Sequence, residues 1–160
     1  MDRKQATVNP PAMKALALLL AAMCTACTGH DTFCRFHSIG ESIWHKDSVI
    51  CFEVAVHDTL SAHNVSLELR TDDQYPYKNL WLFISLRKPS GEIRRDTLEC
   101  QLADDNGKWY GTGISLHKLT VPYDTGLVYP QAGIYTYTIA HAMRNDRLPG
   151  ISEVGLRILR

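Results

Sequence analysis

The stretch Asn79-Leu80-Trp81-Leu82-Phe83-Ile84-Ser85-Leu86 decides the fold. Apolar side chains occupy every second position, and two of the intervening positions hold Trp81 and Phe83. A period of two is typical of a β-strand, because successive side chains of a strand point to opposite faces of the sheet. Since both faces of this stretch carry large apolar groups, we expect a central strand that forms the middle of the core.

The same period continues on both sides of this stretch. Apolar residues alternate in further segments, which lie at 52–56, 65–69, 93–102, 114–119, 133–139 and 151–159. Turn-forming residues separate them, at 61–64, 88–91, 104–107 and 145–150, and no segment of helical period alternates with the strands. The sequence therefore predicts an all-β fold: a single-domain antiparallel β-sandwich, immunoglobulin-like or jelly-roll-like, with seven or eight strands.

One long stretch lacks this period. Residues 120–131 contain Pro122, Gly126 and Pro130 and show no alternation. We expect a loop there, because proline and glycine interrupt regular structure.

The N-terminus has the pattern of a lipoprotein signal peptide. Basic residues precede a nine-residue apolar run from Ala15 to Met23, which is too short to span a membrane since a spanning helix needs ~20 residues. The run ends in Cys24-Thr25-Ala26-Cys27, a lipobox-like sequence with small residues before Cys27. We therefore predict a signal peptide at 1–26, an acylated Cys27 followed by a tether through residue 35, and the sandwich domain at 36–160.

An ordinary secretory cleavage is the alternative. The position three before Cys27 is Cys24, where lipoboxes usually have Leu, Val or Ile. If Cys27 is acylated, a diacylglycerol and an amide-linked chain anchor the protein firmly, since each buried methylene contributes ~0.8 kcal/mol.

Charge and composition argue against nucleic acid as a partner. The chain has 17 basic and 17 acidic residues, and the predicted signal peptide holds three of the former and one of the latter. The mature chain would then carry 14 basic and 16 acidic residues, whereas nucleic-acid binding calls for a basic face.

The remaining cysteines leave three arrangements open. Cys34, Cys51 and Cys100 are an odd number in a compartment that permits disulfides. Cys51 and Cys100 both lie in strand-like segments, which favours two small buried core residues. A bridge between Cys51 and Cys100, or a pairing that involves Cys34, is the alternative.

No pattern of catalytic or metal-binding residues is present in the sequence. The seven histidines show no HxH, HExxH or HxxxH spacing, and no serine sits in a Gly-x-Ser-x-Gly motif. Gly111-Thr112-Gly113 lacks the lysine that a phosphate loop needs, and the paired aspartates at 72–73 and 104–105 are explained as turn residues. We expect no enzymatic activity, no metal and no cofactor.

Aromatic residues are the remaining indication of a binding function. In Tyr75-Pro76-Tyr77 the proline stiffens the chain between two rings that we expect to be exposed. Together with Trp109, these residues are candidates for a partner-binding surface, because flat amphipathic rings give contact area at a low entropic cost. The alternative is a structural corner whose rings pack inward and whose hydroxyls bond nearby backbone.

An ordered set of short motifs resembles the gliding-motility lipoprotein family GldH. The set runs through most of the mature chain: Trp44 and Asp47, Leu69-Arg70, Tyr75 to Leu80, Asp96-Thr97-Leu98, Asp105 to Gly113, Met143-Arg144, Leu148 to Ile151 and Val154 to Arg157. The resemblance implies an outer-membrane lipoprotein needed for gliding, alongside machinery for surface-protein secretion, with no catalytic residues to carry over.

Two binding functions follow as expectations. The first is a lipid-anchored accessory or assembly factor that contacts envelope proteins, and the second is a lipid-anchored module that binds a glycan. Only Asp31 is acidic within five residues of Cys27, so we expect the periplasmic face of the membrane. An exposed, coplanar aromatic row would favour a glycan, and a mixed apolar patch with arginine would favour a protein.

Overall fold

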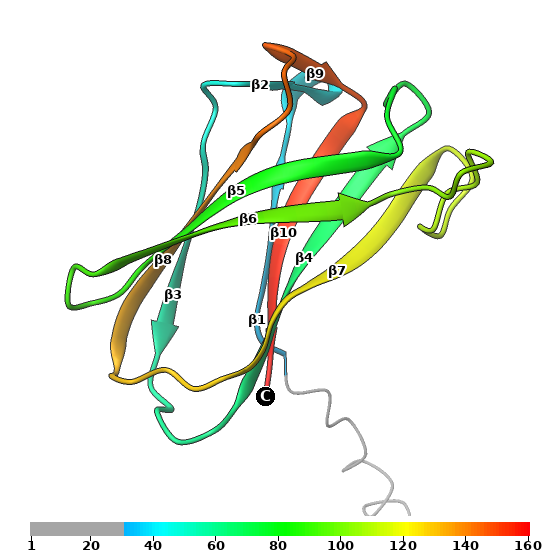
Figure 1. The fold of residues 1–160 in the computed structure, drawn as a ribbon. Helices are drawn as coiled ribbons and strands as arrows, with labels where there is room; N and C mark the ends of the chain where they lie inside the picture. The colour runs from blue at the N-terminus through cyan, green and yellow to red at the C-terminus, as the bar shows by residue number, and fades with distance from the viewer. Residues whose placement is uncertain (1–30) are drawn as a thin grey trace, which may run out of the picture. The chain divides into compact units, whose positions relative to one another are not determined.

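The structure is a computed structural model that describes residues 31–160; the predicted signal peptide and Cys27 lie outside the described residues. Two four-stranded antiparallel sheets form a sandwich (Figure 1). The first sheet has the order β1 (Asp31–Ser38), β10 (Ile151–Leu159), β4 (His63–Asp72) and β7 (Leu116–Leu127). The second has the order β3 (Ile50–Val56), β8 (Gly133–His141), β5 (Asn79–Arg87) and β6 (Ile93–Gln101). The 3-10 turn η2 (Gly40–Ser42) precedes a short pair, β2 (Ile43–His45) and β9 (Arg147–Pro149).

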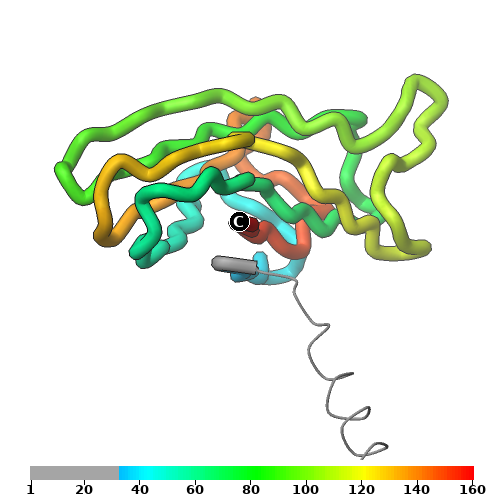
Figure 2. Tube along the Cα trace, turned by 90° about the horizontal axis from the view of Figure 1, so that it is seen from below, coloured from blue at the N-terminus to red at the C-terminus, as the bar shows by residue number. Residues whose placement is uncertain are grey.

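The strand order is that of a jelly roll. Among the eight strands of the two large sheets, the first along the chain pairs with the last, β3 with β8, β4 with β7, and β5 with β6. This is the pairing of one long hairpin folded over on itself. Figure 2 shows β5 and β6 along the upper side of the view, with β1 and β10 on the opposite side. The predicted antiparallel sandwich is confirmed, in its jelly-roll form and with one additional short pair of strands.

The core consists of the inward faces of these strands. In β3 and β4 the alternate residues predicted to share a face are buried, and in β5 so are Leu80, Leu82, Ile84 and Leu86. The prediction that β5 is a central strand is confirmed, since it pairs with both β6 and β8. Its other face is solvent-exposed, with Trp81 and Phe83 outside, because a two-layer sandwich buries only one face of each sheet.

The predicted loop at 120–131 is wrong over most of its length. β7 continues through it to Leu127, and Pro122 pairs with Ser66 of β4. β7 is an edge strand, so a missing backbone donor is tolerated there, and the register shifts twice along the β4–β7 pair. The bulges remove the alternation by which a strand is recognised in a sequence. At the other end of the chain, β1 begins at Asp31, within the segment predicted as tether.

The burial of the cysteines differs from the favoured expectation that Cys51 and Cys100 are both core residues. Cys100 is buried, but Cys51 and Cys34 are exposed, and all three are free thiols. Cys51 points outward because its neighbours Ile50 and Phe52 on β3 point into the core. A bridge between Cys51 and Cys100 is excluded by topology, since β3 and β6 are opposite edges of one sheet, about 14 Å apart at a strand spacing of ~4.8 Å.

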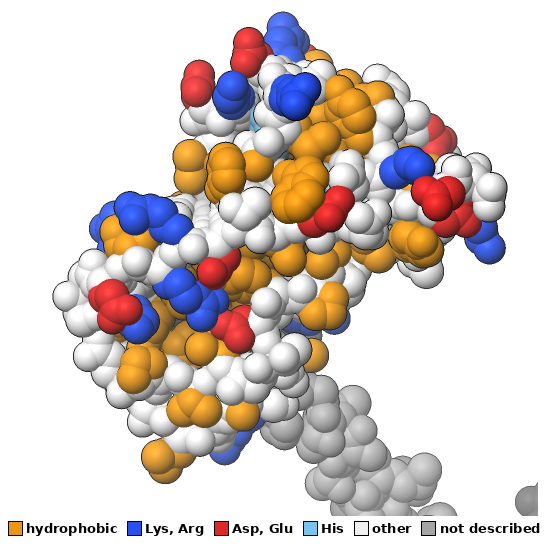
Figure 3. All heavy atoms as spheres, in the orientation of Figure 1, with side chains coloured by type: hydrophobic (Ala, Val, Ile, Leu, Met, Phe, Trp, Pro, Cys, Tyr) orange, Lys and Arg blue, Asp and Glu red, His pale blue; other side chains and the backbone are white. Residues whose placement is uncertain are grey.

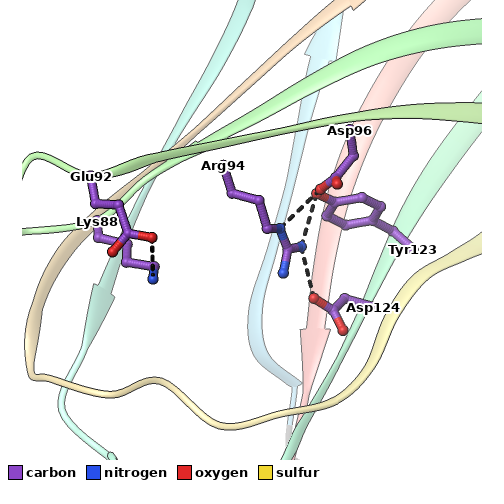
Figure 4. A network of polar contacts seen from close by, with 6 residues as sticks. All are labelled: Lys88, Glu92, Arg94, Asp96, Tyr123 and Asp124. Carbon is purple, nitrogen blue, oxygen red and sulfur yellow. Dashed lines mark hydrogen bonds and ion pairs between the residues drawn. The ribbon is translucent and has the colours of Figure 1, made fainter.

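A polar cluster joins the edge strands β6 and β7 across the sandwich (Figure 4). The Arg94 guanidinium donates to Asp96 (2.9 Å), to the Tyr123 hydroxyl (3.0 Å) and to Asp124 (2.8 Å), and the Tyr123 hydroxyl donates to Asp96. Burial raises the pKa of Tyr123 to about 12, and its bond to Asp96 acts in the same direction. Because the hydroxyl stays protonated and the guanidinium stays charged at ordinary pH, these charge-assisted hydrogen bonds link the two edge strands at ordinary pH.

The buried His141, at the end of β8, makes stability depend on pH. Its ring is 3% exposed and lies edge-on to Trp44 at 5.5 Å, and burial lowers the pKa of the imidazole below 6.5. Below pH 6.5 the imidazole of His141 therefore binds a proton in the unfolded chain, whereas in the native state it stays neutral until a lower pH. We expect the free energy of unfolding to fall by up to ~1.4 kcal/mol per pH unit as pH drops below 6.5, from this residue alone.

Chemical denaturation of wild type and His141→Phe between pH 5 and 8 checks this expectation. The variant should show a shallower decline at the acidic end, because phenylalanine keeps the ring contact with Trp44 and does not titrate. Equal slopes in the two proteins would show that His141 is not the group responsible.

Candidate functional site

The four candidate binding residues from the sequence lie in three different environments. Tyr75 is 5% exposed, and its hydroxyl donates to the backbone carbonyl of Asn79 at 2.7 Å. Gly150 makes the close approach possible: it has φ +83°, and a Cβ there would lie 2.3 Å from the Tyr75 nitrogen. Burial raises the pKa of Tyr75. The expectation of an exposed ring is wrong for Tyr75, which is a core residue.

Pro76 and Tyr77 are on the surface, as expected. The Tyr77 ring stands edge-on to the buried Tyr75 ring, with centroids 5.8 Å apart, and its hydroxyl donates to Asn145 Oδ1 at 2.7 Å. One ring of the motif therefore anchors the loop and the other is presented to solvent in a fixed orientation.

Trp109 belongs to another part of the molecule. It is half-buried in the segment that follows β6, where its ring stacks on His117 of β7 at 4.5 Å and 13°. The His117 Nε2 atom lies 2.9 Å from Asp73 Oδ1, which holds the histidine in this position. Trp109 packs the segment against β7 and does not line the same surface as Tyr77.

Two stretches of the chain, 77–81 and 142–145, meet around Tyr77 and form a hollow that we call the β5 groove. It has a volume of about 320 Å³ and is lined by Tyr77, Asn79, Trp81, Ala142, Met143, Arg144 and Asn145. The backbone of β5 holds the far wall in place: Ala142 N–H donates to the Trp81 carbonyl at 2.7 Å, and Trp81 N–H donates to Met143 Sδ at 3.4 Å. The groove therefore consists of the start of β5 and of loop residues on either side, which hydrogen bonds hold against this strand.

Exposed aromatic rings mark this face of the second sheet. Tyr77 is 37%, Trp81 38% and Phe83 55% exposed, and the residue of β8 that pairs with Phe83 is the small Ala140. Ala142 lies beside Trp81 in the lining of the groove, so the Trp81 and Phe83 rings both have a small side chain next to them. In Figure 3, hydrophobic side chains gather between the regions of β5 and β9, with charged side chains at their margin. Because exposed apolar patches are often interaction sites, this face is a candidate binding surface.

Most polar groups at the groove are already paired with one another. Asn79 Nδ2 donates to Glu99 Oε1 at 2.6 Å, and Tyr77 donates to Asn145. Arg144 differs: its side chain is exposed, and it makes no ion pair or hydrogen bond with any residue in 31–160. The groove thus presents aromatic faces, a thioether and one uncompensated positive charge.

Within residues 31–160 there is no group of three or more His, Cys, Asp or Glu side chains placed to hold a metal ion. The three buried histidines with unbonded ring nitrogens, His63, His117 and His141, lie on separate strands. The same part of the chain contains no helix with the length and apolar character needed to cross a membrane.

A jelly-roll sandwich that carries an aromatic groove on one outer face is typical of a binding domain. The family model described as "GldH lipoprotein" matches residues 31–158, and the chain belongs to this family. It is similar to the gliding motility lipoprotein GldH of Flavobacterium johnsoniae, with 34% identity over 89% of this chain and 93% of the relative. It is also similar to a GldH homolog of Christiangramia forsetii, with 30% identity over 84% of this chain and 86% of the relative.

The groove was only partly foreseen from the sequence. Tyr77 was a candidate, whereas Trp81 and Phe83 were assigned to the core and Met143 and Arg144 had no assigned role. A signal was present in β5 itself, because a strand with large apolar residues on both faces must expose one of them in a two-layer fold.

Proposed function

We propose that this chain is a lipid-anchored accessory or assembly component of the gliding-motility machinery and the surface-protein secretion associated with it. It acts by contact with envelope proteins and not as an enzyme. The anchor is an acylated Cys27, and the location is the periplasmic face of the outer membrane. The match to the GldH lipoprotein family over residues 31–158 is the observation that carries this proposal.

Two features of the molecule support the proposal. The β5 groove combines Tyr, Trp, Met and Arg, the residue types enriched at protein interfaces. The lipobox-like sequence before Cys27 accounts for the lipoprotein character that the family name describes.

Cys27→Ser tests the anchor. The acyl chains are the proposed anchor, and the apolar run at 15–23 is too short to span a membrane, so the variant should move from the membrane fraction to the soluble fraction with its melting temperature unchanged. Fractionation, together with metabolic labelling by a palmitate analogue, measures this. A variant that stays with the membrane, combined with a wild type that takes up no label, contradicts the lipoprotein assignment.

A glycan-binding module is the second candidate. The observation in its favour is the position of Trp81 and Phe83 on one flat face of β5, two residues apart, since aromatic faces stack on sugar rings. Under this alternative the anchored domain would hold an envelope polysaccharide instead of a protein.

A further inference from the structure

We infer that the β5 groove binds a protein segment in which an apolar side chain lies within a few residues of a carboxylate. The inference rests on the proposed role as an envelope interaction module and assigns its contact surface. The apolar side chain enters between Trp81 and Met143, and the carboxylate pairs with Arg144 at the rim.

The choice of a protein segment over a saccharide follows from how the polar groups are engaged. Saccharide sites need free amides and carboxylates to meet ring hydroxyls, but here Asn79 Nδ2 is bonded to Glu99 and Asn145 Oδ1 accepts from Tyr77, so each amide has one of its two polar atoms engaged. Besides the remaining amide atoms, the groove offers a pair of aromatic faces and the Met143 thioether. Methionine and aromatic residues adapt to aliphatic and aromatic side chains of a partner.

Charge complementarity supplies the second part of the inference. Arg144 is the lining residue that carries a charge, and it has no partner among residues 31–160. The neighbouring Asp146 lies 3.8 Å from Lys46, so its charge is compensated elsewhere. An exposed cation at the rim of an apolar hollow selects an acidic partner and fixes its orientation, while the buried aromatic contacts supply most of the affinity.

The groove is preorganised for this role. The backbone of Trp81 is held by hydrogen bonds to Ala142 and to the Met143 sulfur, and the Tyr77 ring is fixed by its contact with Tyr75 and its bond to Asn145. A ring that is already fixed, such as that of Tyr77, loses little conformational entropy on binding. At about 320 Å³, the hollow lies at the small end of the range of ~300–1,000 Å³ for ligand sites, which suits one or two side chains of a peptide.

Selection from a displayed library of random twelve-residue peptides tests this inference, with the full chain in lipid nanodiscs as target and empty nanodiscs as counter-selection. We expect the recovered peptides to carry Asp or Glu within three positions of a large apolar residue. Trp81→Ala should weaken binding of a recovered peptide at least tenfold, whereas Tyr110→Ala, at an exposed ring outside the groove, should change it less than twofold.

Arg144→Glu is the sharper test, because Arg144 is exposed and its replacement leaves the fold intact. When this variant is the target of the selection, the recovered peptides should carry Lys or Arg in place of Asp or Glu. The inference is overturned by a library that yields no binder, by binders that do not respond to Trp81→Ala, or by an acidic preference that survives Arg144→Glu.

Saccharide binding is a separate outcome of the same experiment. If a panel of oligosaccharides binds in a Trp81-dependent manner and no peptide does, the groove is a glycan site and the inference fails. Each of these results leaves the Cys27→Ser fractionation unaffected, so failure of the groove assignment is distinguishable from failure of the proposed function.

Discussion

Replacing Tyr75 by alanine is expected to lower the free energy of unfolding by ~3–5 kcal/mol, the range for emptying a buried aromatic position. The ring is buried against Gly150, and its loss also removes the bond from the hydroxyl to the Asn79 carbonyl at the start of β5. Tyr77→Ala is the matched control, since it removes a ring of the same motif that is 37% exposed. Its expected cost is about 1 kcal/mol, mainly from the edge contact with Tyr75.

Urea unfolding of both variants separates a structural from a functional ring. The urea concentration at the midpoint of unfolding should fall sharply for Tyr75→Ala and only slightly for Tyr77→Ala. For Tyr75→Ala the slope of the unfolding free energy against urea concentration should stay unchanged. Binding at the β5 groove, corrected for the difference in stability, should fall more for Tyr77→Ala than for Tyr75→Ala. Equal destabilisation by the two changes would mean that Tyr77 is also part of the core and would remove it from the groove.

Leu82→Ala is expected to cost ~2–5 kcal/mol of unfolding free energy. Leu82 is fully buried at the middle of β5, paired with Leu98 on one side and His141 on the other, so truncation leaves a cavity that the two flanking strands cannot close. Ile84→Ala on the same face should behave alike, since Ile84 is 1% exposed.

Phe83→Thr provides the comparison on the opposite face of the same strand. Phe83 is 55% exposed, and threonine keeps the strand preference, so the change should stay within about 0.5 kcal/mol of wild type. Thermal or chemical unfolding of the pair measures the difference between the faces. A Leu82→Ala midpoint equal to that of wild type would show that β5 does not form the middle of the core.

The strands of the two large sheets could be predicted where apolar and polar residues alternate along the sequence. β3, β4, β5 and β8 keep a strict period, and β10 keeps the apolar alternation from Val154 onward, so the buried face could be read from the sequence. β7 could not, because Pro122 and Gly126 lie in an edge strand whose bulges shift the register. The outward position of Cys51 follows from the same alternation, because Phe52 and Val54 face inward. The apolar residues on both sides of Cys51 nevertheless favoured a buried position in the sequence.

The groove could not be predicted from any one segment. Tyr77 and Trp81 lie in one stretch and Met143 follows β8, and their meeting depends on the pairing of β5 with β8, which a sequence pattern does not specify. The turn at Tyr75-Pro76-Tyr77 was recognised as stiff, yet which ring points inward depends on the absence of a side chain at Gly150. Long-range contacts of this kind leave no local signal.

The intact mass of the protein extracted from the host membrane tests the central claim, a lipid-anchored envelope lipoprotein, most directly. We predict a chain that begins at Cys27 and carries a thioether-linked diacylglycerol and an amide-linked acyl chain. A chain that begins at any other residue, or one that begins at Cys27 without acyl groups, would contradict it.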